Sequence, residues 1–474
     1  MPRVITRLAL LGGALLSGGL LALAGGLHPS WAAAWIASVP VLVAGFKSTG
    51  RGALALGLLS GLVGGTSVLG YYATVLTMPV ALVILVLQAI VYAGGVRLAW
   101  GARRRLPDLL SVFALPCWFA AFDLLVAAFS ANGTAGSPAY SQMNFPAVLQ
   151  VASLGGVPAV TFVVYLFSSI LAHVIAGVGP RMRRLIVVAP ALLVVAACVG
   201  LGNWRISTAP AEPKILVAAA ALDQKSALPD DWHAAVEAYR PLLAQARDRH
   251  VGVMVLPEEI ALVSADDLQA IQADLGSLAR LSEMSLAVGF RVADATKLRN
   301  VLLLFTPDGR ALSYDKQHLI PGLEFPRITP GTSPALIAEV GGHRLGGAIC
   351  KDFDFVDVSR SLGAGRAGLV LAPAWDFRED GWLHGRMAML RGVEGGFTLV
   401  RAAREGTMSV SDRYGRVLAE APSGPTAPLL VTQAPVPTSG PTIYAQVGDV
   451  FGWACVGLLL LLMASALSSQ HRKV

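Results

Sequence analysis

The stretch LGGAICKDFDF (residues 345–355) joins an apolar run to a group of charged residues, and a single cysteine, Cys350, stands at the junction. The run has the length and composition of a buried strand, so Cys350 is expected where a strand ends and a loop begins. Such positions suit reactive side chains because the strand fixes their place and the loop leaves access. The other three cysteines, Cys117, Cys198 and Cys455, lie in apolar spans, and no close cysteine pair suggests a zinc site or a disulfide framework.

The polar region that surrounds this stretch, residues 212–440, is predicted to form an α/β domain. Short apolar runs bounded by turn residues predict buried strands, and helical patterns lie between several of them. The predicted strands are 214–222, 251–257, 285–290, 300–309, 344–350 and 368–374, and the predicted helices include 230–249, 265–284 and 381–395. The sequence TPDGR (306–310) predicts a hairpin turn.

The rest of the chain is typical of a membrane protein. Of the 474 residues, 54% are hydrophobic and only 14% are charged, which is too apolar for an ordinary soluble protein. We expect an N-terminal membrane domain (1–204) with about seven transmembrane helices and one C-terminal transmembrane helix (446–468). The apolar runs are 5–26, 31–46, 52–72, 79–99, 109–130, 147–178, 184–202 and 446–468, of which the second is short for a bilayer.

Basic residues between these spans predict the orientation. The formal charge is +7, and much of the excess lies in short clusters between apolar segments, a pattern of topology signals rather than of nucleic-acid contacts. The clusters are formed by Arg3, Arg7, Lys47, Arg51, Arg97, Arg103, Arg104, Arg105, Arg181, Arg183, Arg184, Arg472 and Lys473. The alternate loops 27–30, 73–78 and 131–146 contain no Lys or Arg. Both termini are therefore expected in the cytoplasm and the α/β domain on the outer side of the membrane.

Polar residues inside the predicted spans have two interpretations. Asp123 is an acid within a span, which makes it a candidate functional residue, or it is the structural partner of a Ser or Tyr hydroxyl. For His173, packing or a contact between helices is favoured over a role as a ligand.

Reactive side chains follow several predicted strands of the α/β domain. Glu258 and Glu259 end one strand, Lys316 follows a strand pair and Cys350 ends a third strand. A carboxylate can take the thiol proton and an ammonium can stabilise a thiolate or an oxyanion, so the set could form a nucleophilic site. Taken singly, each residue also fits an ordinary role, a solvated carboxylate or a packed cysteine.

The motifs LPEE, YDKQHLIPGLE and AICKD, in this order, resemble the nitrilase (carbon–nitrogen hydrolase) superfamily. Together with the spans, they resemble the apolipoprotein N-acyltransferase family. The likeness extends to NVLLLFTPDGRALSYDK, to MAMLRGVEGGFTLVRAAREG and to AYSQMNFPAVLQVASLGGVPAVTFVV (139–164). The resemblance implies a polytopic α-helical membrane domain of about eight spans plus a nitrilase-like α-β-β-α sandwich.

The resemblance also implies a role for individual residues. Glu258 would be the general base, Lys316 the cation that stabilises the oxyanion, and Cys350 the nucleophile that carries the acyl group. Glu324 would position the amine or share protons with Lys316. The expected substrate-binding residues are Lys351, whose backbone N–H would face the oxyanion, Trp375, Asp376 and Tyr140. For Trp375 and Asp376, which follow a predicted strand, ordinary loop packing is the alternative.

The implied reaction is acyl transfer in a bacterial cytoplasmic (inner) membrane, with the catalytic domain on the periplasmic side. A phospholipid would give its acyl chain to Cys350 as a thioester, and the N-terminal cysteine of a diacylglyceryl lipoprotein would accept it. No metal or organic cofactor is expected, and the protein is expected to be a monomer that binds membrane lipid and no nucleic acid.

Departures from the family pattern leave alternatives open. Lys351-Asp352 stands where the family usually has Tyr-Glu, AREGTMS (403–409) replaces an Asn-Gly pair, and the segment 325–349 is short. The alternatives are a membrane-tethered amidase, an acyltransferase for a different amine, and a non-enzymatic scaffold. The intact set of Glu258, Lys316, Glu324 and Cys350 argues against the scaffold.

Overall fold

The computed structural model describes the chain except for residues 1, 178–180, 224–227, 295–296, 427 and 472–474. The chain forms two compact units. The helical unit comprises 1–128, 136–208 and 449–474, and the α/β unit comprises 129–135 and 209–448. Two of the basic residues that predict the orientation, Arg472 and Lys473, lie outside the described residues.

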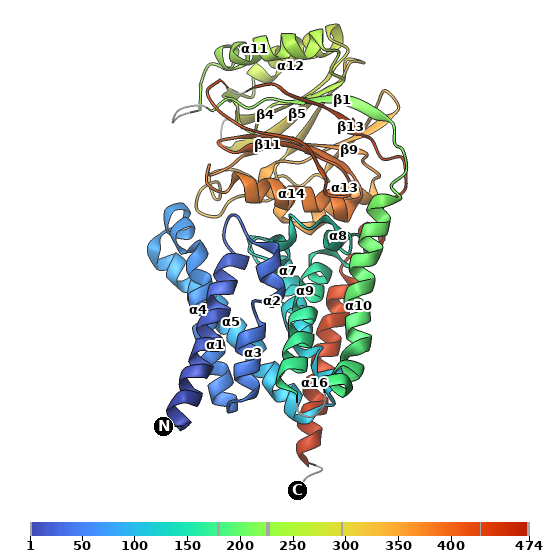
Figure 1. The fold of residues 1–474 in the computed structure, drawn as a ribbon. Helices are drawn as coiled ribbons and strands as arrows, with labels where there is room; N and C mark the ends of the chain where they lie inside the picture. Colours follow the sequence, from blue (N-terminus) through green and yellow to red (C-terminus); the bar gives the residue numbers. More distant parts are fainter. Residues whose placement is uncertain (1, 178–180, 224–227, 295–296, 427, 472–474) are drawn as a thin grey trace. The chain divides into compact units, whose positions relative to one another are not determined.

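The helical unit contains long apolar helices joined by short ones (Figure 1). Its elements are α1 (Pro2–Ala24), α2 (Trp31–Ile36), α3 (Val39–Phe46), α4 (Gly50–Val75), α5 (Met78–Arg105), α6 (Asp108–Ser111), α7 (Ala114–Phe129), η1 (Pro138–Gln142), α8 (Pro146–Leu149), α9 (Ala152–Ala176), α10 (Arg181–Ser207) and α16 (Val450–His471). Among the described residues, six helical stretches are long and apolar enough to cross a membrane. Two shorter apolar stretches, Trp31–Phe46 and Val450–Ser465, coincide with the second and eighth predicted spans.

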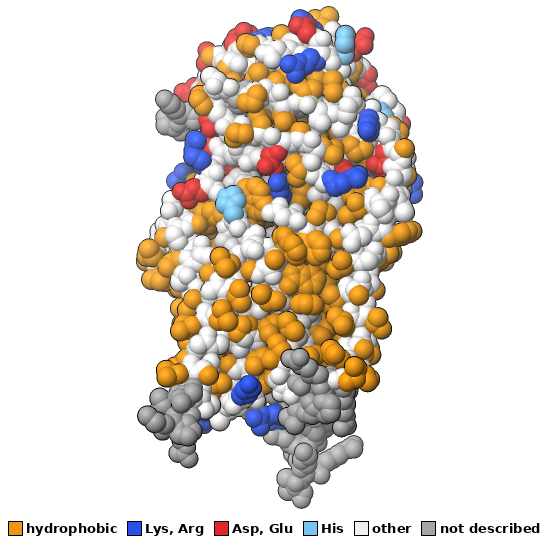
Figure 2. All heavy atoms as spheres, viewed as in Figure 1, with side chains coloured by type: hydrophobic (Ala, Val, Ile, Leu, Met, Phe, Trp, Pro, Cys, Tyr) orange, Lys and Arg blue, Asp and Glu red, His pale blue; other side chains and the backbone are white. Residues whose placement is uncertain are grey.

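Large hydrophobic side chains cover the outside of the helical unit. Leu193 and Leu461 are 68% and 66% exposed, and over this unit most of the coloured side chains in Figure 2 are hydrophobic. An apolar surface of this extent fits lipid rather than water. The composition, the helix lengths and this surface together make the chain a membrane protein.

Asp123 has structural partners inside the helical unit. Its Oδ2 accepts a hydrogen bond of 2.8 Å from the Ser137 hydroxyl and another from the Thr161 hydroxyl. Two hydroxyl donors satisfy the hydrogen-bonding needs of this buried carboxylate. These contacts agree with the interpretation of Asp123 as the structural partner of a hydroxyl. His173 likewise contacts the hydroxyl of Ser111 on a neighbouring helix, at 2.9 Å.

The α/β unit contains two mixed β-sheets. The first has the strand order β13-β1-β2-β4-β5-β6, with β3 paired to β4, and the second has the order β12-β11-β10-β9-β8-β7. The strands are β1 (Lys214–Ala219), β2 (Val253–Val255), β3 (Leu262–Ser264), β4 (Ser285–Ala293), β5 (Leu298–Phe305), β6 (Ala311–Asp315), β7 (Leu336–Val340), β8 (His343–Gly347), β9 (Leu369–Trp375), β10 (Thr398–Arg404), β11 (Thr407–Ser411), β12 (Val417–Pro422) and β13 (Leu430–Pro435).

Helices cover the outer faces of both sheets, which gives the α-β-β-α order of layers (Figure 1). They are α11 (Trp232–Asp248) and α12 (Asp267–Leu281) on the first sheet, and α13 (Val356–Ala364) and α14 (Gly381–Gly395) on the second, with η2 (Cys350–Asp354) and α15 (Ile443–Val447) nearby. The core between the sheets is built from buried strand residues such as Val255, Leu302, Leu371 and Val400. Alternate strand residues face the helices and form a second core, which includes Met254 and Leu303.

The strands deliver the predicted site residues at their carboxyl ends. Glu258 comes three residues after the end of β2, and Lys316 directly follows β6. The prediction that a strand runs through Cys350 is slightly wrong, because β8 ends at Gly347 and Cys350 begins the 3-10 turn η2. Strands β8, β9 and β10 are parallel neighbours, so their ends meet at one edge of the sheet.

Candidate active site

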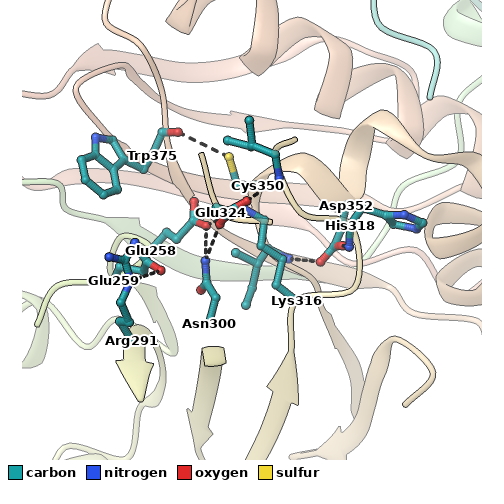
Figure 3. A network of polar contacts seen from close by, with 12 residues as sticks. Glu258, Glu259, Arg291, Asn300, Lys316, His318, Glu324, Cys350, Asp352 and Trp375 are labelled. Carbon is teal, nitrogen blue, oxygen red and sulfur yellow. Dashed lines mark hydrogen bonds and ion pairs between the residues drawn. The ribbon is translucent and has the colours of Figure 1, made fainter. Parts of the chain in front are cut away.

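A buried lysine lies between two carboxylates at the centre of the site (Figure 3). Lys316 Nζ donates to Glu258 Oε1 at 2.8 Å, and to Glu324 Oε1 at 2.8 Å and Oε2 at 3.0 Å. All three residues are buried, with exposed fractions of 1% for Lys316, 2% for Glu258 and 5% for Glu324. Charges in such surroundings interact strongly because little water screens them.

Asn300, on β5, also bridges the two carboxylates. Its side-chain amide donates to Glu258 Oε1 at 2.6 Å and to Glu324 Oε1 at 3.2 Å. The second oxygen of Glu258, Oε2, is buried and has no hydrogen-bond partner among the residues that the structure describes. Both Lys316 and Asn300 therefore hold one oxygen of Glu258 and leave the other free to accept a proton.

Cys350 lies within electrostatic reach of this cluster. Burial raises the pKa of its thiol well above the ordinary value, and the charge of Glu258 adds to the rise while Lys316 opposes it. Burial alone would lower the pKa of Lys316, but the charges of Glu258, the Cys350 thiolate and Glu324 raise it well above its ordinary value. Both shifts favour the protonated form, so the thiol and the lysine ammonium each hold a proton more tightly than in water. The thiol donates to the backbone oxygen of Trp375 at 3.4 Å.

Asp352 ties the turn of Cys350 to the loop after Lys316. The Asp352 carboxylate is fully buried and accepts four hydrogen bonds, from the backbone N–H groups of Gln317, His318 and Ile349 and from the Tyr314 hydroxyl, over 2.8–3.1 Å. Burial raises the pKa of Asp352 to about 6, although the donated hydrogen bonds act in the opposite direction. This single side chain thus fixes the nucleophile turn relative to the lysine loop.

A second ionic network begins at Asp376, the residue after Trp375. Arg401 Nη2 and Nη1 contact the two oxygens of Asp376 at 2.5 and 3.0 Å, and His384 Nδ1 lies 3.5 Å from both Asp376 and Asp380. Burial would lower the pKa of His384, but the hydrogen bond to Asp376 and the charge of Asp380 raise it to about 9. Asp376, Asp380 and His384 are close enough to hold a metal ion. Because Arg401 occupies both Asp376 oxygens, an ion-pair network fits this group better than a metal site.

A cavity of about 310 Å³ opens beside the cluster. Glu258, Lys316 and Glu324 line its polar end, and Leu298, Ile320 and Ile328 are among the apolar residues that line the rest. Trp375 and Asp376, two of the expected substrate-binding residues, stand in its wall. A site with an apolar lining and a few convergent polar groups is typical of a pocket for a small molecule.

The other two expected substrate-binding residues lie elsewhere. Lys351 Nζ lies 3.3 Å from Asp354 Oδ2 and 3.3 Å from Asn132 Oδ1, and Lys351 is not among the residues that line the cavity. Tyr140 is buried in η1 of the helical unit. A substrate-binding role for both remains a prediction.

Four residues of the site were not predicted from the sequence: Asn300, Asp380, His384 and Arg401. Asn300 carried a usable signal, because it is a polar residue at the head of the apolar run NVLLLF, inside one of the motifs that carry the resemblance. Arg401, on β10, lies inside the motif MAMLRGVEGGFTLVRAAREG. Asp380 and His384 lie just before this motif, at the start of α14.

Comparison with known proteins shows which proteins this chain resembles. The family model "Apolipoprotein N-acyltransferase N-terminal domain" matches residues 17–170. An apolipoprotein N-acyltransferase from Geobacter metallireducens is 27% identical over 94% of this chain and 92% of its own length. One from Rhodopseudomonas palustris is 31% identical over 35% of each chain. A crystal structure of an amidase from Nesterenkonia sp. covers 50% of this chain and 94% of its own, at 24% identity and a TM-score of 0.43. Along nearly the whole chain, this protein is therefore similar to apolipoprotein N-acyltransferases.

Proposed function

We propose that this protein is a membrane acyltransferase that moves a fatty acyl group from a phospholipid, through a thioester on Cys350, to an amine. The acceptor is the N-terminal cysteine of a diacylglyceryl lipoprotein. The observation that carries the proposal is the free Oε2 of Glu258, in a buried cluster with Lys316 that acts electrostatically on Cys350. The similarity to apolipoprotein N-acyltransferases supports the reaction class.

In the first half-reaction, Glu258 Oε2 takes the proton of the Cys350 thiol as the sulfur attacks the ester carbonyl carbon. The oxyanion that forms is stabilised by Lys316 Nζ and by the backbone N–H of Lys351. When the intermediate collapses, the C–O bond to the glycerol backbone breaks. Glu258 returns its proton to the departing oxygen, which releases a lysophospholipid and leaves the acyl group on sulfur.

In the second half-reaction, the amine nitrogen attacks the thioester carbonyl and Glu258 accepts a proton from it. Collapse breaks the C–S bond and forms the amide, and the proton held by Glu258 restores the thiol. Glu324, which contacts Lys316 through both oxygens, keeps the ammonium in place during both steps. The proposed reaction uses no metal or organic cofactor.

The proposal includes the placement of the chain. Residues 1–204 and 446–468 would lie in the bacterial cytoplasmic membrane, and residues 212–440 would form the catalytic domain on the periplasmic side, as the basic loops predict. Reporter fusions at about 135 and 300 should then lie outside and one at about 103 inside. A fusion at 300 that reports the cytoplasm would contradict this orientation.

The transferase reading is tested by the fate of the acyl group. Purified protein loaded with a phospholipid should discharge onto a diacylglyceryl-cysteine peptide, which becomes triacylated, faster than it loses the acyl group to water. If a peptide whose N-terminus is blocked by acetylation discharges the protein equally fast, the amine is not the acceptor. If only water discharges it, the protein is a hydrolase and the proposed transfer is wrong.

A further inference from the structure

Residues 129–135 belong to the α/β unit although helices of the other unit flank them in the sequence. They lie against η2, the turn that begins at Cys350. The backbone N–H and the hydroxyl of Thr134 both donate to the backbone oxygen of Asp354, at 2.8 and 2.7 Å. These residues are 220 positions apart in the sequence, so the contact is a feature of the tertiary fold.

The contact is close enough to exclude a side chain. Gly133 has a φ of +54°, and a Cβ built on it would lie 2.4 Å from the backbone oxygen of Asp354. Only glycine adopts this conformation at such a distance without displacing its neighbour. Gly133 and Thr134 are both buried, so this part of the loop packs against the turn.

Lys351 completes the contact from the side of the turn. Its Nζ lies 3.3 Å from Asn132 Oδ1 in the loop and 3.3 Å from Asp354 Oδ2 in the turn, and it lies over the ring of Phe355. The side chain thus joins the loop to the turn, one residue after the nucleophile. The Lys351 side chain therefore contacts the loop and the turn, whereas its position next to Cys350 in the sequence suggests a side chain that lines the cavity.

The turn needs such support because its first residue is strained. Cys350 has a φ of +43°, which residues other than glycine rarely adopt and which persists only where the surroundings enforce it. Asp352 holds the turn to the lysine loop on one side. The loop 129–135 holds it from another side, through Asp354 and Lys351.

We propose that residues 129–135 are a positioning element for the nucleophile, and that Lys351 and Asn132 are a positioning pair that keeps the Cys350 turn in its strained conformation. The inference rests on the proposed role of Cys350. Neither side chain touches the reacting atoms: they act by holding the sulfur and the following backbone N–H where Glu258 and Lys316 can act on them. Loss of the pair would let the turn relax and move the thiol away from this cluster.

The test uses the full chain with Cys117, Cys198 and Cys455 replaced by alanine, so that iodoacetamide reports on Cys350 alone. Charged groups that act on the Cys350 thiol are Glu258, Lys316, Asp376 and Arg401. In the parent protein, burial should raise the pH midpoint of alkylation above that of an ordinary thiol, about 8.5. In Lys351→Met and Asn132→Ala the midpoint should fall toward that value, and the rate of acyl loading from phospholipid should drop about tenfold or more at an unchanged KM.

Three variants serve as controls. Lys351→Arg keeps a cation within reach of Asn132 and should restore most of the loading rate. Ala131→Ser changes an exposed neighbour in the loop, and Lys297→Met removes an exposed lysine elsewhere in the unit; both should behave like the parent. Because Lys351 and Asn132 act through one contact, the double variant should be no slower than the slower single variant.

A parent-like alkylation midpoint in folded Lys351→Met and Asn132→Ala overturns the inference, whatever their loading rates. Asn132 is exposed, so Asn132→Ala decides the matter if Lys351→Met does not fold. If the parent protein never loads with phospholipid, the proposed function fails. The alkylation midpoints still decide whether the loop positions the turn, so the two failures are distinguishable.

Discussion

Lys316 donates a hydrogen bond of 2.8 Å to one oxygen of Glu258, and the other oxygen of Glu258 remains buried without a hydrogen-bond partner among the described residues. The two oxygens of the Glu258 carboxylate therefore have different roles. One is held by a cation, which keeps the side chain oriented, and the other is available for a proton. A general base in a dry site needs both properties.

Replacing the proposed base by its amide should abolish most of the loading of Cys350. Glu258→Gln keeps the size of the side chain but cannot take the thiol proton, and a thiol with a raised pKa stays protonated near neutral pH. We expect the rate of loading from phospholipid, followed by mass spectrometry, to fall at least about a hundredfold. Glu259→Gln is the matched control, because both oxygens of Glu259 are paired with Arg291, at 2.9 and 2.5 Å. Equal losses in the two variants would contradict the role of Glu258.

Removal of the buried cation should damage both the chemistry and the fold. In Lys316→Met, Glu258 and Glu324 lose the charge that compensates them in a site that little water reaches. Breaking such a buried ion pair costs about 3–5 kcal/mol of stability, and the loss of an oxyanion donor costs about a hundredfold or more in rate. Thermal unfolding in detergent and single-turnover loading measure the two effects separately. A folded variant that loads at the wild-type rate would exclude Lys316 from the mechanism.

Asn300 gives a prediction that concerns pH. Asn300→Asp replaces an amide donor by a third carboxylate that faces Glu258 and Glu324. An added negative charge raises the pKa of neighbouring carboxyl groups, so the base should ionise at higher pH. The rising limb of the pH–rate profile for loading should therefore move to higher pH, whereas Asn300→Ala should slow loading with a smaller displacement. An unchanged profile in Asn300→Asp would show that Asn300 does not act on the base.

The ionisation of Asp352 should make the stability of the folded protein depend on pH. Its folded pKa of about 6 lies above the unfolded value of about 3.9, so the folded state binds the proton more tightly. The resulting stabilisation is fully present below about pH 4 and is lost as the pH rises through about 6. The melting temperature of the wild type should therefore rise relative to that of Asp352→Asn as the pH is lowered across this window. Parallel melting curves from pH 4 to 7 would contradict the assignment.

Much of this site could be predicted because its main residues follow strands in a recognisable order. Glu258, Lys316, Glu324 and Cys350 each lie in a short motif, and the apolar runs beside three of them predict strands. The contacts between them depend on register. Asn300 meets the cluster because Val301 pairs with Asp315, which places Asn300 beside Lys316, and the sequence alone does not fix that pairing.

Contacts across long separations could not be predicted at all. Nothing in the local sequence of Asn132, in a loop between predicted spans, indicates that it meets Lys351, 219 residues later. Arg401 and Asp376 pair because β10 and β9 are parallel neighbours, although 25 residues separate them. In the helical unit, the second predicted span consists of the two short helices α2 and α3. Its apolar composition was evident from the sequence, but the break near Ala37 was not.

The central claim is that Cys350 carries the acyl group, and intact-mass measurement of the purified protein after incubation with phospholipid tests it most directly. The account predicts a shift by one fatty acyl group, located on Cys350, that neutral hydroxylamine removes because a thioester is far more labile than an amide or an ordinary ester. Cys350→Ala should show no shift, and Cys350→Ser should either fail to load or hold an adduct that resists hydroxylamine. A wild-type protein that no phospholipid modifies, while a small amide acylates Cys350, would contradict the account.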